Sequence, residues 1–318
     1  MGKNTGGYAN ALYSEVAPHV FPYPGGYGTT GPLTLRAISA EYSEVMQRFA
    51  ERKYLSKRHH LAYCFNGGWP YLALDSPLLL ARFNAEIRQA VVARRPSARV
   101  YCRGQDRHFD YMRPGLFRPP NDRYPPQCLL AAERDFAAEL AIGSAAQRFR
   151  RPHLPALLQH YGIRTSWLDV VDNLYVAIWF ATHIKRGDAW IDKRSGDCGW
   201  LYFISTANST SCLTVMDFRD SHHHLSTRPH SQHGVSVTRS DNKWSDTRLG
   251  FEEFVVATVR LRCSCKWRLY GFMASKEFLF PNETEDNTLR LLRRPRSSSL
   301  LHKIEKKHGF RSGTLGNL

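Results

Sequence analysis

One stretch, residues 157 to 182, constrains the fold most, because it sets polar side chains between two apolar segments. Apolar positions from residue 173 to 182 predict a buried helix, and residues 164 to 168 suit a short strand. Polar groups held between two core elements are typical of a rigid binding site. An equally good interpretation is that Gln159, His160 and Asp169 satisfy buried backbone groups around a turn. The polar side chains concerned are Gln159, His160, Thr165, Ser166 and Asp169.

The rest of the chain carries enough apolar sequence for a sizeable core. Its 318 residues are 42% hydrophobic and 12% aromatic, which is typical of a globular protein with one large or two small domains. Helical spacing alternates with short apolar runs, which favour strands at 99–105, 199–204, 254–261 and 277–281. This mixture predicts a protein of the α/β (α+β) class.

Composition changes along the chain predict four regions. Residues 1–33 are rich in Gly, Tyr and Pro and predict a flexible arm. Residues 34–98 hold two segments with helical spacing, the second after the N-cap pattern Ser76-Pro77, and predict an N-terminal helical element. Residues 99–289 contain the polar stretch and the expected strands, and we expect them to form the catalytic domain. Residues 290–318 carry eight Lys or Arg against one Glu and predict a basic C-terminal tail.

The formal net charge of +16 points to anionic partners. Such a field favours nucleic acid or an anionic cofactor, and a protein partner stays possible. No apolar run approaches the roughly 20 residues of a membrane span, so we expect no membrane partner. Seven scattered cysteines favour reduced thiols in the cytoplasm, with a nuclear location left open.

The chain offers few groups of catalytic type. Arg103 ends a predicted strand beside Gly104, where a planar guanidinium suits a phosphate or carboxylate and the glycine lets a ligand approach the backbone. An arginine that bridges a carboxylate in a turn is the simpler alternative. Glu277 enters a predicted strand, where it is either a well-held reacting carboxylate or an edge-strand charge. The consecutive histidines at 222–224 and the Cys263/Cys265 pair lack ligand spacing, so we predict no metal site.

Several sequence blocks stand out in order along the chain: Tyr101-Cys-Arg-Gly-Gln105, Arg113-Pro-Gly-Leu-Phe-Arg118, Leu157 to Ala181, Arg228 to Val235, and Leu279-Phe-Pro281. Together these blocks resemble the FRG domain family, over about residues 99–285. The match departs from the family pattern where Cys102 separates the aromatic residue from Arg103, and where Ser166 stands at a position usually occupied by Arg.

The order of Arg, Ser/Thr and Glu is also similar to the Arg-Ser-Glu plan of ADP-ribosyltransferases. This resemblance implies a mixed-sheet core of that type, with Arg103 holding NAD as co-substrate and Glu277 stabilising the reacting ribose. A backbone pocket near Gly104 would take nicotinamide. Ser275, where many such enzymes have Glu or Gln, leaves the acceptor chemistry open. The middle position of the plan fits either Thr165-Ser166 or Ser226-Thr227. The other contacts that we expect in the pocket are Gln105, Gln159, His160, Asp169, Arg228 and Gln232.

We therefore expect an NAD-dependent ADP-ribosyltransferase that modifies a macromolecule, with DNA or RNA favoured over protein. One alternative is a non-catalytic module that binds nucleic acid or protein, using Arg103, His160 and Arg228 for phosphates. Another is a metal-independent nuclease that uses His160 and Asp169.

Overall fold

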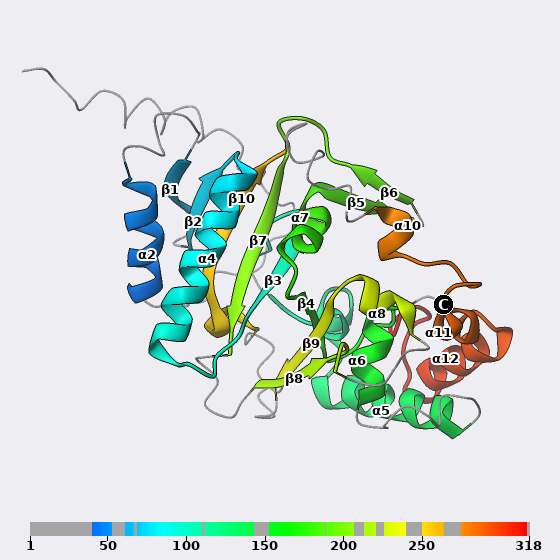
Figure 1. Ribbon diagram of the computed structural model, residues 1–318. Coiled ribbons are helices and arrows are strands. Elements are labelled where there is room, and N and C mark those ends of the chain that lie inside the picture. Colours follow the sequence, from blue (N-terminus) through cyan, green and yellow to red (C-terminus); the bar gives the residue numbers. More distant parts are fainter. Residues whose placement is uncertain are drawn as a thin grey trace, which may run out of the picture. The chain divides into compact units, whose positions relative to one another are not determined.

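An eight-stranded mixed sheet runs through the described chain, and all its strand pairs are antiparallel except β2 with β10 (Figure 1). The computed structural model describes residues 40–52, 61–66, 69–109, 112–142, 153–187, 189–206, 213–220, 226–239, 250–263 and 275–316. In spatial order the strands are β1 (Leu61–Asn66), β2 (Trp69–Leu74), β10 (Val255–Arg262), β7 (Cys198–Ser205), β3 (Val100–Gln105), β4 (Leu168–Val171), β9 (Gly234–Arg239) and β8 (Leu213–Asp217).

Helices cover this sheet, and a separate hairpin stands beside it (Figure 1). The central strands β7 and β10 are buried along almost their whole length, because elements cover both of their faces. The class is α+β, as the sequence predicts. The hairpin is β5 (His183–Arg186) with β6 (Ala189–Asp192), and the helices are α2 (Ala40–Ala50), α4 (Pro77–Arg94), α5 (Pro126–Ile142), α6 (Leu154–Gln159), α7 (Leu174–Thr182), α8 (Thr227–Ser231), α10 (Lys276–Leu279), α11 (Asn287–Leu292) and α12 (Pro295–Lys307).

The predicted N-terminal helical element is only partly helical. Helix α4 starts after Ser76, whose side chain caps it as expected. However, β1 and β2 lie between the two helices and join the main sheet, so residues 34–98 are not a separate element. The sequence does not predict β2, because this strand contains Pro70. The register with β10 begins at Leu72, so the missing N–H of Pro70 interrupts no bond to that strand. The predicted arm, residues 1–33, lies outside the described residues.

The predicted basic C-terminal tail is folded. Helix α12 packs against α5 and buries Leu301 and Ile304. The Glu305 carboxylate is also buried, and it accepts hydrogen bonds from the backbone N–H groups of Gly313 at 3.1 Å and Leu315 at 2.8 Å. All eight basic residues of this region are exposed, and four of them, Arg296, Lys303, Lys306 and Lys307, lie on the outer face of α12. Residues 36–318 form one unit.

Two strand predictions are wrong. Residues 276–279 form the short helix α10, because the Ser275 hydroxyl accepts from the Phe278 N–H at 3.2 Å and caps a helical turn. In the central stretch, β4 begins only at Leu168, and the residues before it form a turn. The other predicted strands correspond to β3, β7 and β10, and α7 spans nearly the predicted residues with Asn173 as its N-cap.

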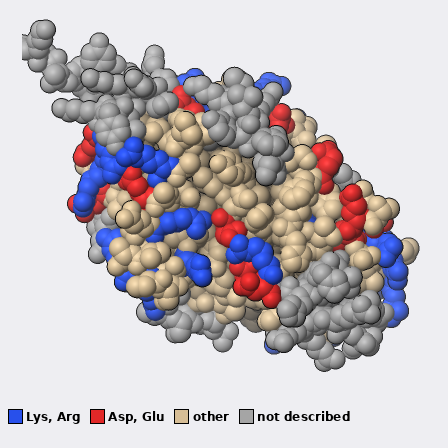
Figure 2. All heavy atoms as spheres, viewed as in Figure 1, with Lys and Arg blue, Asp and Glu red and all other residues tan. Residues whose placement is uncertain are grey.

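Surface charges of opposite sign lie next to one another on the face seen in Figure 2. Arg52 pairs with Glu86, for example, and Arg219 pairs with both Asp172 and Asp217. The high net charge therefore does not by itself mark a binding surface on this face. None of the helices in the described ranges has the length and apolar character needed to cross a membrane.

Candidate functional site

The sheet separates between β3 and β4, and a cavity opens at that point. The two strands share a single register pair, Cys102 with Val171. Continuing this antiparallel register would set Gly104 opposite Asp169. Instead, the Arg103 guanidinium donates to the Asp169 backbone carbonyl and links the strands through a side chain. The cavity has a volume of about 280 Å³.

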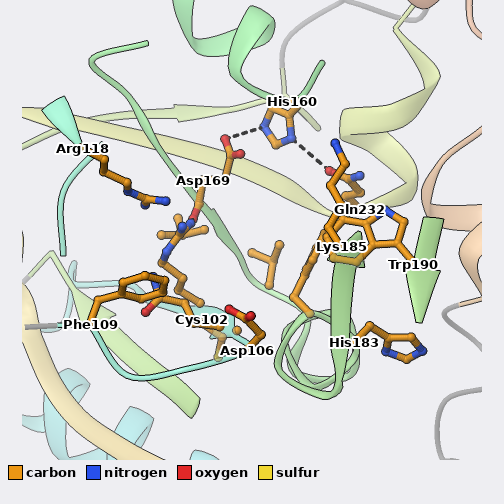
Figure 3. Close-up of a pocket in the computed structure, with 16 residues that line it drawn as sticks. Cys102, Asp106, Phe109, Arg118, His160, Asp169, His183, Lys185, Trp190 and Gln232 are labelled. Atoms are coloured by element: carbon orange, nitrogen blue, oxygen red, sulfur yellow. Dashed lines mark hydrogen bonds and ion pairs between the residues drawn. The ribbon is translucent and has the colours of Figure 1, made fainter. Parts of the chain in front are cut away.

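Residues from both sides of this separation line the cavity, together with α6, α7, the β5–β6 hairpin and the loop after β3 (Figure 3). Charged and polar side chains share the lining with three aromatic rings, of which Phe180 and Trp190 pack against each other. The lining residues are Cys102, Arg103, Gly104, Gln105, Asp106, Phe109, Arg118, His160, Asp169, Val170, Val171, Phe180, His183, Lys185, Trp190 and Gln232.

Two arginines give the cavity an excess of positive charge. Burial lowers the pKa of Arg103, and only the nearby Asp169 and Tyr202 counteract it. Burial and the neighbouring Arg103 together lower the pKa of Arg118 to about 9. The Arg103 Nε is buried and has no hydrogen-bond partner in the described chain, and Arg118 Nε donates only to the Arg113 carbonyl, at 2.7 Å. Asp169 is the carboxylate next to both Arg103 and Arg118, so the two guanidiniums together favour an anionic ligand.

The shared carboxylate is held by a buried histidine. His160 Nε2 lies 3.5 Å from Asp169 Oδ1, and the Ser236 hydroxyl lies 3.4 Å from each of them. Gln232 Nε2 donates to the Leu279 carbonyl at 2.9 Å, so its Oε1 faces His160 Nδ1 at 3.1 Å. With this amide orientation Nδ1 carries a proton, and Nε2 is directed at Asp169 (Figure 3).

Glycines let the surrounding backbone approach closely. A Cβ on Gly104 would lie 1.8 Å from the Ala177 carbonyl oxygen of α7, and one on Gly199 would lie 2.3 Å from that of Ala181. The expectation that Gly104 makes room for a ligand needs correction, because the closest group is the backbone of a helix. A Cβ on Gly234 would lie 2.6 Å from His160 Cε1, so this glycine makes room for the imidazole.

Six of the residues that the sequence singled out line the cavity: Arg103, Gly104, Gln105, His160, Asp169 and Gln232. Three others, Gln159, Thr165 and Ser166, stabilise the turn before β4. Gln159 Oε1 accepts from the Thr165 hydroxyl at 2.9 Å and from its N–H at 3.2 Å. The Ser166 N–H donates to Glu133 at 2.8 Å, and burial raises the pKa of Glu133 to about 7. The contacts of Gln159 therefore agree with the alternative that it satisfies a backbone group in a turn.

Residues 226–228 do not line the cavity, but Arg228 contacts His160, which does. Ser226 bonds to Thr288 at 2.8 Å, and Thr227 donates to the Glu285 carbonyl at 2.7 Å. Arg228 donates to the His160 carbonyl at 3.2 Å, and its guanidinium lies over the rings of Tyr161 and Phe280, 5.0 and 5.3 Å from their centroids.

Glu277 is exposed on α10 and does not line the cavity. Its expected position at the start of a strand is therefore wrong. The lining residues that sequence reasoning assigned no role include Arg118, Lys185 and Trp190. Of these three residues, only Arg118 could have been found from the sequence, because it ends the proline-bearing block Arg113–Arg118.

No three His, Cys, Asp or Glu side chains among the described residues are grouped so that they could hold a metal ion. The consecutive histidines at 222–224 and Cys265 lie outside that set.

Residues 98–189 match the family model of the FRG domain. The match includes every lining residue of the cavity except Trp190 and Gln232. The segment that is similar to the FRG domain therefore supplies the separated strands, both arginines and the His160–Asp169 pair. No curated protein and no solved structure matches the chain.

Proposed function

We propose that the FRG cavity binds the pyrophosphate of NAD, and that the protein transfers ADP-ribose to a macromolecule. The observation that carries the proposal is the pair Arg103 and Arg118, two guanidiniums that share one carboxylate in a cavity. Guanidinium groups donate paired hydrogen bonds to phosphate oxygens, and a dianionic ligand would relieve the repulsion between them.

The size and lining of the cavity fit part of a dinucleotide. About 280 Å³ lies just below the range of ligand pockets, about 300 to 1,000 Å³. This volume admits a pyrophosphate with one attached ring system, and the remainder of NAD would extend towards solvent. Phe180 and Trp190 form an aromatic wall suited to a planar base or nicotinamide.

In this proposal Asp169 takes the role that sequence comparison gave to Glu277. Cleaving the bond between nicotinamide and ribose develops positive charge on the ribose, and a carboxylate beside it lowers the barrier. Asp169 lines the cavity, with its side chain 30% exposed, whereas Glu277 is outside it. His160 and Gln232 would act as positioning residues that hold this carboxylate.

A macromolecular acceptor, nucleic acid ahead of protein, agrees with the net charge of +16. The acceptor would reach the cavity from its open side, after nicotinamide has left.

Nicotinamide release from NAD tests this function, with purified protein alone and with added RNA, DNA or cell lysate. We expect release that Asp169→Asn abolishes and Glu277→Gln leaves intact. If NAD raises the Tm of the wild type but not of Arg103→Lys, NAD binds in the cavity. The matched control is Arg134→Lys, which changes an exposed arginine on α5. Turnover that survives Asp169→Asn but not Glu277→Gln would overturn the assignment to Asp169. No release with any acceptor and no thermal shift would overturn the function.

One observation favours a second candidate, a metal-independent nuclease. The His160–Asp169 pair at 3.5 Å is an acid–base combination that suits attack on a phosphodiester. Cleavage of labelled RNA or DNA in EDTA without NAD, lost in His160→Gln, would establish this activity instead.

A further inference from the structure

The β5–β6 hairpin presents one face to the cavity and continues it outward. Side chains alternate along a strand, and the register pairs His183 with Asp192 and Lys185 with Trp190 on the same face. His183, Lys185 and Trp190 all line the cavity. Figure 3 shows Lys185 and Trp190 together at one side of it. The hairpin therefore places a cation directly across from a large aromatic ring at the edge of the site.

Aromatic rings extend from this position to the surface. Trp190 stacks on Phe280 with ring centroids 5.2 Å apart and an interplanar angle of 29°. Phe180 packs edge-on against both rings, at 5.9 and 6.1 Å. Two residues before Phe280, on α10, Phe278 is 54% exposed. The cluster of Phe180, Trp190 and Phe280 thus extends outward from the cavity wall, and Phe278 adds an exposed ring on the adjoining helix α10.

Cations flank these rings. Lys185 is exposed opposite Trp190, and Lys276 is exposed at the start of α10. Neither lysine forms an ion pair within the described ranges, whereas Asp192 is paired with His183 at 2.7 Å. Glu277 is an exposed carboxylate beside Lys276. The two ammonium groups are therefore available to an anionic partner.

We propose that this aromatic rim, consisting of Phe180, Trp190, Phe278 and Phe280 with Lys185 and Lys276, binds single-stranded nucleic acid. Unpaired bases stack on aromatic faces, and lysines beside them contact phosphates, which is how sequence-tolerant single-strand sites are built. A duplex keeps its bases stacked inside and cannot use such rings. The rim adjoins the cavity, so a strand bound there lies where the acceptor of the proposed function is needed. The role as acceptor site rests on that function, whereas strand binding itself does not.

Fluorescence anisotropy with a labelled 12-nucleotide oligo(dT) or oligo(U) and the full chain tests strand binding. We expect Trp190→Ala to raise the Kd about tenfold, since stacking of one base contributes about 1 to 3 kcal/mol. Trp190→Phe should retain most of the affinity, and this separates stacking from a folding defect. A duplex of the same length should bind more weakly than the single strand.

The salt dependence of binding tests the lysines. The slope of log K against log[salt] is negative, and each single-strand phosphate contact contributes about −0.7 to it. The double variant Lys185→Ala/Lys276→Ala should therefore make the slope less negative by about 1.4. Lys303→Ala/Lys306→Ala removes two exposed lysines of α12 and is the matched control, which should leave the slope unchanged.

Loss of binding in the α12 variant but not in the rim variant would overturn the proposal, as would equal affinity for duplex or no binding of any oligonucleotide. Retention of a lysate protein without oligonucleotide binding would equally reject it and indicate a protein partner. Lys276 and Phe278 belong to the rim but do not line the cavity, so the variant Lys276→Ala/Phe278→Ala keeps the two proposals distinguishable. Weaker strand binding with an intact NAD thermal shift in this variant supports the rim, and intact strand binding without any NAD shift contradicts only the proposed function.

Discussion

The Arg103 guanidinium donates to the backbone carbonyl of Asp169 on the neighbouring strand, at the point where β3 and β4 stop pairing. A charged side chain thus occupies the place of a backbone ladder bond. This arrangement holds the sheet together and leaves the Arg103 Nε buried without a partner in the described chain. The same residue therefore supports the fold and provides an anion-binding group.

Replacing Arg103 with Lys should affect both stability and ligand binding. Lysine keeps a positive charge but loses the planar fork, so the bond to Asp169 and the paired contact with phosphate are both weakened. We expect a loss of about 1.5 to 3 kcal/mol in the free energy of unfolding, measured in urea, as for hydrogen bonds of charged groups. We also expect added pyrophosphate to raise the Tm of the wild type but not that of Arg103→Lys. An unchanged pyrophosphate shift would show that the anion binds elsewhere.

Replacing Arg118 with Gln should separate stability from binding. The pKa of Arg118 is lowered to about 9 by burial and by Arg103, so its charged form is less favourable in the protein than in water. Removing a half-buried, poorly compensated charge is often neutral or stabilising, so we expect the unfolding free energy to rise by roughly 1 kcal/mol. Pyrophosphate affinity, measured by calorimetry, should fall. Stability and affinity that fall together would contradict this account.

Gly104→Ala should destabilise the protein severely. The added methyl carbon would lie 1.8 Å from the Ala177 carbonyl oxygen, so α7 would have to move away from β3. We expect a cost above about 3 kcal/mol in urea unfolding, in the upper range of single substitutions. Gly162→Ala is the control, because its φ of 91° is strained for alanine but no atom lies near its Cβ, and it should cost only about 1 kcal/mol. Equal effects at the two positions would reject the close approach of the helix.

Glu133 should make the protein less stable as pH rises. Burial raises its pKa from 4.5 to about 7, so the folded protein holds a proton that the unfolded chain has released between these values. Stability is therefore lost as pH rises through this window, by roughly 3 kcal/mol at about 1.4 kcal/mol for each pKa unit. Glu133→Gln keeps an oxygen for the Ser166 N–H and removes the titration. Urea unfolding at pH 5 and pH 8 should show a smaller difference for Glu133→Gln than for the wild type, and equal differences would contradict this assignment.

Local sequence patterns were enough to predict the helices and strands whose residues form one uninterrupted apolar run. Helix α7 follows from an uninterrupted apolar run after Asn173, and β3 and β7 follow from short apolar runs. The polar residues His160 and Asp169 stood out because they belong to a polar patch between two strongly apolar segments. Buried helices and strands place apolar residues at regular spacings in the sequence, and these predictions depended mainly on that spacing.

Only the tertiary structure decided which polar groups share a cavity. Arg118 approaches Arg103 through a loop, and Gln232 reaches His160 across 72 residues of chain. Glu277 has the sequence surroundings of a strand, yet the Ser275 cap turns the segment into a helix and leaves the carboxylate in solvent. Such outcomes depend on contacts between distant segments, which hydrophobic spacing does not encode. The sequence by itself thus determined the pieces of the separated sheet, and long-range packing determined that Arg103, Arg118 and Asp169 meet in the gap.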